Sequence, residues 1–429
     1  MNLINFMVVF IFIVLTIFSL NCSYKMAKQK DRIVLTPLLL FTVLQVFMVN
    51  IGMLIIAIEV NKDSIYVGVI LLSLQLFFIN LGALIVGNKN YIYTAVRYKE
   101  PILRKSIVLI AYALTLSLIA ILVKDRLLVF FDLLQNISKG AVTESIRTMS
   151  EMRREFSFGG DSNTGKVTQL NNTVLVFLSI YILNSNFGKF IKIGILFTTL
   201  FMILSSGQRW PLFEALMVYA IFYSVSHKLQ FNWIKALKIS CIVAAILFAL
   251  SYFQPRFVMT EDLLTNLMLN LEAVVYRLFV SQAMTSYYVF SLIPESLEFG
   301  IGAYITQDFS TFLPGYQEGF STFIYKLTHD GKIGSASFSA LSLFYADFGY
   351  LSILVSFIFG VFLQSYTNKF SGFPPTKIRL IFHSFVIMAL ATTSLGSISG
   401  VFYHGFISGF MLYILLKIIF TLVSPRLRV

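Results

Sequence analysis

Long apolar runs, separated by short polar segments, recur from one end of the chain to the other. Runs of roughly 17–25 residues are long enough to cross the hydrocarbon core of a bilayer as helices. The apolar runs lie at residues 2–21, 33–57, 65–87, 106–123, 168–186, 193–206, 211–226, 239–253, 338–363, 380–397 and 401–423. The runs at 193–206 and 239–253 are short. The pattern predicts an all-α polytopic membrane protein with about eleven transmembrane helices.

Basic residues collect in every second connection between these runs. They are Lys25, Lys28, Lys30 and Arg32 after the first run, Lys89, Arg97, Lys99, Arg104 and Lys105 after the third, Lys189 and Lys192 after the fifth, Lys228, Lys235 and Lys238 after the seventh, Lys369, Lys377 and Arg379 after the ninth, and Arg426 and Arg428 after the last. Cytoplasmic loops of membrane proteins carry an excess of Lys and Arg. We therefore expect the N-terminus outside the membrane and the C-terminus in the cytoplasm.

Two connections on the predicted outer side are much longer than the rest. Residues 124–167 mix seven basic with six acidic residues, and in residues 254–337 acidic residues outnumber basic ones eight to four. Within the second, apolar residues recur at three- and four-residue steps over 263–278. This spacing predicts an amphipathic helix that lies along the outer face. The chain is therefore expected to form one integral membrane domain, residues 1–429, with two enlarged outer loops.

The composition agrees with a membrane protein and excludes a soluble one. Hydrophobic residues make up 57% of the chain and charged residues 12%, whereas a typical soluble domain is about a quarter charged. The net charge of +13 would suggest nucleic acid in a soluble chain. Here the basic residues lie in the loops of one side, so membrane lipid is the expected partner and no nucleic acid is expected.

Common signatures of nucleotide and metal chemistry are missing from the sequence. It has no P-loop, no GxGxxG after a strand, no CxxC and no HExxH. The four histidines, at 227, 329, 383 and 404, are scattered and do not have the spacing of metal ligands. These observations argue against a nucleotide-driven pump and a metalloprotease, and we expect no cofactor and no metal.

Arg209 lies between two apolar runs, at a hairpin tip on the predicted outer side. The positive-inside rule does not account for a cation there. The residue is either an interface anchor beside Trp210 or a ligand for an anionic group, since a guanidinium near a helix start, with Pro211 in the first turn, suits phosphate. Glu214 follows within the run, either as an ion-pair partner or as an active-site carboxylate.

Two further arginines lie in the second long outer segment. Arg277 interrupts the apolar face of the predicted amphipathic helix, and Arg256 follows Gln254 and Pro255. Each is either a surface charge at the membrane interface or a second contact for the same anionic group.

Two more titratable residues stand near the ninth run. His329 is followed by Asp330 in a polar loop, where it is either a solvated side chain or an acceptor for a hydroxyl proton near neutral pH. Asp347 lies inside the run, where an isolated carboxylate is costly. It therefore needs an arginine partner or a polar cavity, and it is either a structural ion pair or a site residue.

Three stretches carry a resemblance to a known family. They are LSSGQRWPLFEAL at 204–216, YRLFVSQ at 276–282 with YYVF at 287–290, and GSASFSALSLFYADFGYL at 334–351. The first resembles the Ser-x-Arg-containing signature of bacterial O-antigen polymerases of the Wzy type and of the related O-antigen ligases. The third is similar to the family's glycine-containing segment, where the chain re-enters the membrane after its large periplasmic loop.

The resemblance implies a fold and a function that hydropathy does not indicate. It implies a GT-C-like helical bundle in the bacterial inner membrane, with the two long segments in the periplasm as enlarged loops. It also implies a glycosyltransferase of lipopolysaccharide biosynthesis whose substrate is an undecaprenyl-diphosphate-linked oligosaccharide, with a chain-length regulator protein as a partner. The ligases usually show a His-Asn-like pair near the re-entry, whereas here His329 is followed by Asp330. This departure favours a polymerase over a ligase.

The expected chemistry assigns roles to the candidate residues. Arg209, Arg277 and Arg256 would grip the diphosphate, which is already a competent leaving group. Asp347, His329 or Glu214 would take the proton of the acceptor hydroxyl. The rival from another class is a flippase for the lipid-linked oligosaccharide, or another transporter, but long outer segments do not fit a flippase.

Overall fold

The computed structural model of the chain describes residues 3–29, 32–88, 105–122, 124, 162–205, 209–226, 265, 268, 269, 271, 272, 276, 279–310, 318–331, 338–371, 376–396, 398, 401, 409–411, 413, 414 and 418. These residues form helices and turns, apart from one short antiparallel hairpin of β1 (Lys28–Gln29) and β2 (Arg32–Ile33). The helices from the first half of the chain are α1 (Leu3–Ala27), α2 (Pro37–Gln45), η1 (Val46–Asn50), α3 (Ile51–Val60), α4 (Asp63–Val86), α5 (Lys105–Leu122), α8 (Ser162–Leu183), α9 (Lys189–Ser205) and α10 (Arg209–Ser226). Those from the second half are α13 (Ser281–Leu292), α14 (Ala303–Ser310), α15 (Phe320–Thr328), α16 (Ala340–Phe348), η3 (Gly349–Leu351), α17 (Ser352–Ser371) and α18 (Lys377–Thr392).

Four described helical stretches are long and apolar enough to cross a membrane: Asn5–Ala27, Pro37–Val60, Asp63–Val86 and Ala340–Phe370. Shorter apolar helices cover Ser106–Ile121, Thr173–Leu183 and Pro211–Ser226. The prediction of an all-helical, multi-pass membrane protein is therefore confirmed. Each predicted run coincides with one helix or with consecutive helical segments, except the run at 239–253, which lies outside the described residues, and the run at 401–423, of which only a few residues are described.

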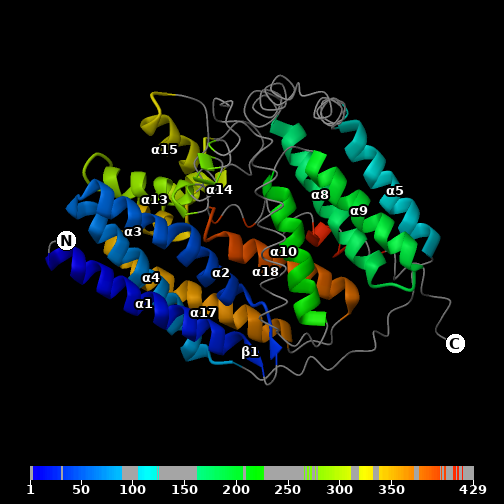
Figure 1. The fold of residues 1–429 in the computed structure, drawn as a ribbon, viewed down its shortest axis with the longest axis horizontal. Coiled ribbons are helices and arrows are strands. Elements are labelled where there is room, and N and C mark those ends of the chain that lie inside the picture. Colours follow the sequence, from blue (N-terminus) through cyan, green and yellow to red (C-terminus); the bar gives the residue numbers. More distant parts are fainter. Residues whose placement is uncertain are drawn as a thin grey trace.

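The long helices pack in two groups, which Figure 1 shows side by side. In the first group α17 lies along α4, and α1 packs against α4. Glycine permits this close approach, because a Cβ on Gly82 would overlap the carbonyl oxygen of Phe357 and a Cβ on Gly360 would overlap that of Ile79. Small residues at such contacts let the backbones of membrane helices approach closely.

The second group contains α5, α8, α9, α10 and α18, and α18 also packs against α2 and so joins the groups. Buried hydroxyl groups link its helices. The hydroxyl of Tyr112 on α5 bonds Thr198 and Thr199 of α9 at 2.7 and 2.8 Å, and Ser179 of α8 contacts the hydroxyl of Tyr219 on α10. Since lipid offers no partner for a hydroxyl, these bonds help to specify which helices are neighbours.

Hydrogen bonds join the helix ends that the basic loops connect. The side chain of Asn88 donates to the carbonyl of Met26, and that of Asn368 donates to the carbonyl of Gly87. The backbone N–H of Leu35 donates to Ser224, and Val34 bonds Ala27 across the hairpin. These ends of α1, α2, α4, α10 and α17 therefore lie on one side of the bundle, as the alternation of basic loops predicts.

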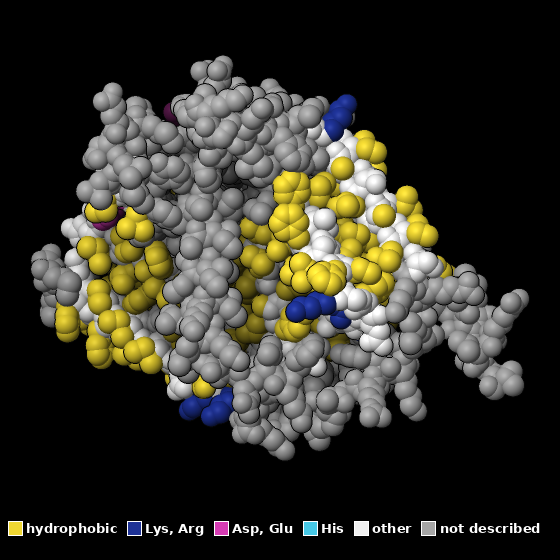
Figure 2. All heavy atoms as spheres, turned by 45° about the vertical axis from the view of Figure 1, so that its right-hand side comes forward, with side chains coloured by type: hydrophobic (Ala, Val, Ile, Leu, Met, Phe, Trp, Pro, Cys, Tyr) yellow, Lys and Arg dark blue, Asp and Glu magenta, His cyan; other side chains and the backbone are white. Residues whose placement is uncertain are grey.

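Large apolar side chains cover the outside of both groups. They include Phe6, Phe10, Ile13 and Ile17 on α1, Ile110, Leu114, Leu118 and Ile121 on α5, and Leu354, Ile358 and Phe362 on α17. Figure 2 shows hydrophobic side chains over most of the described surface of one face. A surface of this kind suits the hydrocarbon of a bilayer.

The ninth apolar run is not one straight helix, although the hydropathy pattern over 338–363 shows a single span. It consists of α16, the 3-10 turn η3 and α17. The break falls at Gly349, whose φ of 55° is in the left-handed region, and a Cβ there would lie 3.0 Å from the ring of Phe299. Glycine is the residue that adopts this conformation without steric cost.

The second long segment that the sequence places outside the membrane contains helices in its described residues. It contributes α13, α14 and α15, which Figure 1 shows together at one end of the first group. α13 packs against α3 and α4, α14 against α15 and α16, and α13 also contacts α16. We call these three helices the cap layer. Within the predicted amphipathic helix at 263–278 the described residues are helical, and Leu271 is half exposed.

Candidate functional site

Arg209 is the first residue of α10. The other end of this helix belongs to the basic side of the bundle, because the side chain of Ser224 accepts a hydrogen bond from Leu35. The helix rises about 1.5 Å per residue, so the backbone of Arg209 stands roughly 22 Å along the axis from that of Ser224. Arg209 therefore lies at the end of α10 that is remote from the basic loops, in agreement with the predicted topology.

Glu214 lies in the second turn of the same helix and is partly buried. It is on α10, in the second helix group, whereas Asp347 and His329 belong to elements around the cap layer. Arg277 and Arg256, the other two arginines expected at the diphosphate, lie outside the described residues.

Asp347 is almost completely buried, at 1% exposure, and its partners are backbone amides. Its Oδ1 accepts from the N–H of Tyr304 at 3.0 Å, and its Oδ2 accepts from the N–H of Ile305 at 2.8 Å. Both donors belong to the first turn of α14, where backbone N–H groups have no partner within the helix. The positive end of the helix dipole stabilises a carboxylate at this position. The N-terminus of α14 thus offsets the free-energy cost of burying the Asp347 carboxylate. The sequence predicted an arginine partner or a polar cavity instead.

The backbone around Asp347 is joined to the same segment. The N–H of Gly300 donates to the carbonyl of Ala346 at 3.0 Å, and the N–H of Ile301 donates to the carbonyl of Asp347 at 2.9 Å. These carbonyls are available because α16 ends at Phe348 and the next turn is 3-10. A Cβ on Gly300 would overlap Oδ1 of Asp347. The end of α16, the turn before α14 and the Asp347 side chain therefore form one unit, which we call the cap junction.

His329 is partly buried at the end of α15 rather than free in a solvated loop. Its Nδ1 lies 2.9 Å from the hydroxyl of Thr328 and 3.2 Å from the carbonyl oxygen of Tyr325. Its ring stacks on that of Tyr325, with centroids 4.0 Å apart, and lies edge-on to Tyr288 at 5.9 Å. These contacts fix the imidazole plane, and among the described residues Nε2 has no hydrogen-bond partner.

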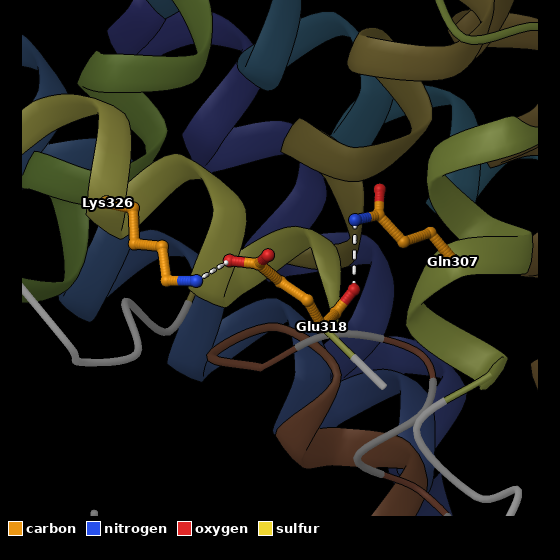
Figure 3. Close-up of polar contacts among 3 residues, drawn as sticks. All are labelled: Gln307, Glu318 and Lys326. Carbon is orange, nitrogen blue, oxygen red and sulfur yellow. Dashed lines mark hydrogen bonds and ion pairs between the residues drawn. The ribbon is translucent and has the colours of Figure 1, made fainter. Parts of the chain in front are cut away.

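Polar contacts tie α15 to α14, as Figure 3 shows. The ammonium group of Lys326 forms an ion pair with Glu318 at 2.8 Å, and the carbonyl of Glu318 accepts from the side chain of Gln307 at 2.9 Å. Gln307 belongs to α14, whose first turn binds Asp347. Asp347 therefore binds the first turn of α14, and His329 follows α15, which these contacts tie to α14.

Sequence reasoning missed a set of buried polar side chains within the apolar runs. Ser339 caps α16 and donates to the side chain of Gln45 at 2.6 Å, and Gln45 donates to Asn50 at 2.9 Å. Gln75 of α4 donates to the carbonyl of Leu341 at 3.1 Å. These amides hold the start of α16 against α2 and α4. The signal in the sequence was the presence of Gln and Asn inside long apolar runs, where polar groups need partners.

Compared with known proteins, the chain matches no family model, no curated protein and no solved structure.

The candidate residues that the structure describes lie in two parts of the helical protein. Around the cap layer are a buried carboxylate held by backbone amides and an imidazole held between tyrosine rings, and the second helix group has an arginine position at the start of α10. Such groups can bind an anionic, hydroxyl-bearing molecule and can accept a proton from one of its hydroxyls.

Proposed function

We propose that this protein is a glycosyltransferase that joins oligosaccharide repeat units carried on undecaprenyl diphosphate into O-antigen or a related surface polysaccharide. The proposal rests on the three family-like stretches of sequence and on the multi-pass helical fold. It includes the finer topology as well: about eleven transmembrane helices in a GT-C-like bundle, the N-terminus and the cap layer in the periplasm, and the C-terminus in the cytoplasm of a bacterium.

The observation that carries the proposal is the position of Arg209. The residue begins α10 at the end remote from the basic loops, where no topological rule calls for a cation. A guanidinium there can make bidentate contacts with a phosphate of the lipid carrier at the outer surface. Arg277 and Arg256 are the proposed further contacts, and together they would stabilise the negative charge that develops on the departing diphosphate.

The proposed transfer breaks the bond between the sugar and the diphosphate and forms a new glycosidic bond to a hydroxyl of the acceptor unit. The hydroxyl proton goes to a base, and the lipid diphosphate leaves with the bonding electrons. Among the candidate bases, both carboxylate oxygens of Asp347 are engaged by α14. Nε2 of His329 is therefore the better candidate, Glu214 on α10 stays a candidate, and Asp347 is assigned to the architecture of the cap junction. The proposed chemistry uses no metal or cofactor, because arginines neutralise the charge.

Gene disruption in the host tests this function, with surface polysaccharide resolved on a gel as the measurement. Loss of a polymerase leaves a single repeat unit attached to the lipid core. Loss of a flippase leaves none, and loss of a ligase leaves polymer that is not attached to the core. Normal long chains in the disrupted strain would refute the proposal. If the protein is a polymerase, a chain-length regulator is its expected protein partner. Co-purification from the membrane tests that association.

A further inference from the structure

Aromatic rings gather where α13 and α15 meet in the cap layer. Tyr325 and His329 stack with an interplanar angle of 7°, and Tyr288 stands edge-on to the imidazole at 79°. Tyr287 packs next to Tyr288, with ring centroids 5.5 Å apart. All four side chains are partly exposed. We call this group the tyrosine platform.

The platform is bordered by polar groups as well as by rings. Burial raises the pKa of Tyr288, and the nearby hydroxyl groups of Tyr276, Tyr287 and Tyr325 raise it further. Because Tyr276 affects the pKa of Tyr288, its side chain, which is 50% exposed, lies within electrostatic range of the platform. The phenol of Tyr288 thus stays neutral at physiological pH and can both donate and accept hydrogen bonds.

The turn that follows α15 adds a carboxylate next to His329 in the chain. Asp330 is exposed and has a φ of 51°, while Nδ1 of His329 is held by Thr328 and Tyr325. These contacts restrict rotation of the imidazole ring, so Nε2 stays in a fixed position beside the rings. An arrangement of flat apolar faces with hydroxyl, imidazole and carboxylate groups at their edges is more selective than a purely apolar surface.

This combination matches one class of ligand. A pyranose ring presents C–H groups on its face and hydroxyl groups around its edge, so it can lie on an aromatic face while its hydroxyls bond to the edge groups. A prenyl chain would gain nothing from the phenols and the carboxylate. A diphosphate would require cations, and the nearby Lys326 is engaged by Glu318.

We propose that the tyrosine platform binds a sugar ring of the oligosaccharide substrate. This inference rests on the proposed function for the identity of the glycan, and it assigns a glycan subsite to the cap layer. Because α14 joins α15 to the cap junction at the end of α16, a glycan on the platform is held by a layer that is packed on the membrane helices. The tyrosine rings of the platform therefore position the sugar rather than react with it.

Direct binding to the purified full-length protein in lipid nanodiscs tests the platform. The probe is a soluble oligosaccharide fragment, released by mild acid from the surface polysaccharide of the host, and the measurement is isothermal titration. Replacing Tyr325 with leucine should weaken binding of the fragment roughly fivefold, the scale of one lost ring contact. Y325F, which retains the ring, should weaken it less. The matched control is Y350L, because Tyr350 is a 67% exposed tyrosine on η3, outside the platform.

Farnesyl diphosphate serves as a second probe that carries the lipid and the diphosphate but no sugar. Its affinity should be the same for Y325L and the parent protein. H329L is the second platform variant, for use if Y325L does not elute as a folded particle, and it should also weaken fragment binding. Equal fragment affinity in the parent and in the folded platform variant would overturn the proposal, as would a parent protein that does not bind the fragment.

The outcome is independent of the gene-disruption experiment. If disruption leaves polysaccharide normal while the fragment still binds through Tyr325, the polymerase assignment fails and the glycan subsite stands. If disruption leaves single repeat units while Tyr325 and His329 variants bind the fragment normally, the polymerase assignment stands and the platform is overturned.

Discussion

Asp347 and Arg209 are the two charged residues that stand out in the apolar runs, and their surroundings in the structure differ. Asp347 is enclosed in the cap junction, where two amides of α14 bind its two oxygens. Arg209 begins α10 at the end of a hairpin, on the side away from the basic loops. Both residues break an apolar pattern, yet Asp347 is bound by backbone amides of a segment about 40 residues earlier, whereas Arg209 begins a helix at the end of the bundle remote from the basic loops.

A charged residue in an apolar run can therefore be accommodated in more than one way. Burying a carboxylate requires compensating hydrogen bonds, and a helix N-terminus supplies them as well as an arginine does. A charge within a span is therefore a weaker indication of catalysis when a helix begins beside it. A cation at a helix start, in contrast, faces the same positive dipole end, so it gains nothing from the helix and is explained better by an anion from outside.

The largest effect is expected for Arg209. R209A should reduce polymer formation about 100-fold or more, the scale of losing a charge-stabilising group in a transition state. R209K should also be impaired, because an ammonium cannot replace a bidentate guanidinium. The measurement is the chain-length distribution of surface polysaccharide on a gel, with protein level in the membrane checked in parallel. K189A is the control, since Lys189 is exposed at the other end of the same hairpin. Normal chains in R209A would make Arg209 an interface anchor.

Replacing Asp347 should act through stability. D347A leaves two N–H groups of α14 without their acceptor and should lower the free energy of unfolding by about 1–3 kcal/mol. D347N keeps one acceptor oxygen and should cost less. The measurement is the thermal unfolding midpoint in nanodiscs, beside polymer formation by the same variants. If D347N keeps its stability but abolishes polymer formation, the carboxylate is itself a reacting group and the contrast with Arg209 fails.

Gly300 offers a smaller test of the same junction. A methyl group in G300A would overlap Oδ1 of Asp347 and the ring of Tyr304, so the carboxylate or the turn must move. Overpacking of this kind should cost about 1–2 kcal/mol of unfolding free energy. G194A is the matched control, because a Cβ on Gly194 of α9 meets open space. Equal unfolding midpoints for the two variants would show that the junction tolerates the displacement.

The smallest effect is expected for the ion pair of Lys326 and Glu318. Both side chains are about one-third exposed, at 34% and 32%, so solvent screens the pair. E318Q should lower the unfolding free energy by about 0.5 kcal/mol. It leaves the backbone carbonyl that binds Gln307 in place, so the cap layer should stay assembled. A loss of unfolding free energy as large as that of D347A would show that the ion pair contributes strongly to the stability of the cap layer.

The sequence by itself determined the helices and indicated which of their ends lie together. Hydropathy is a property of each run alone, and the alternation of basic loops follows from the chain order, so both were predictable; hydrogen bonds such as Asn368 to Gly87 agree with them. The folded second outer segment was visible only as a long polar stretch with one amphipathic region, because short helices such as α14 carry a weak periodic signal.

Tertiary structure alone decided how the charged and polar groups are satisfied. The partners of Asp347 are backbone amides of Tyr304 and Ile305, and any sequence offers such amides, so no side-chain pattern could indicate them. The stacking of His329 on Tyr325 and its edge contact with Tyr288 likewise depend on how α13 and α15 meet. A pattern along the chain reports what each segment must bury, whereas the partner that it finds depends on packing between segments that are distant in sequence.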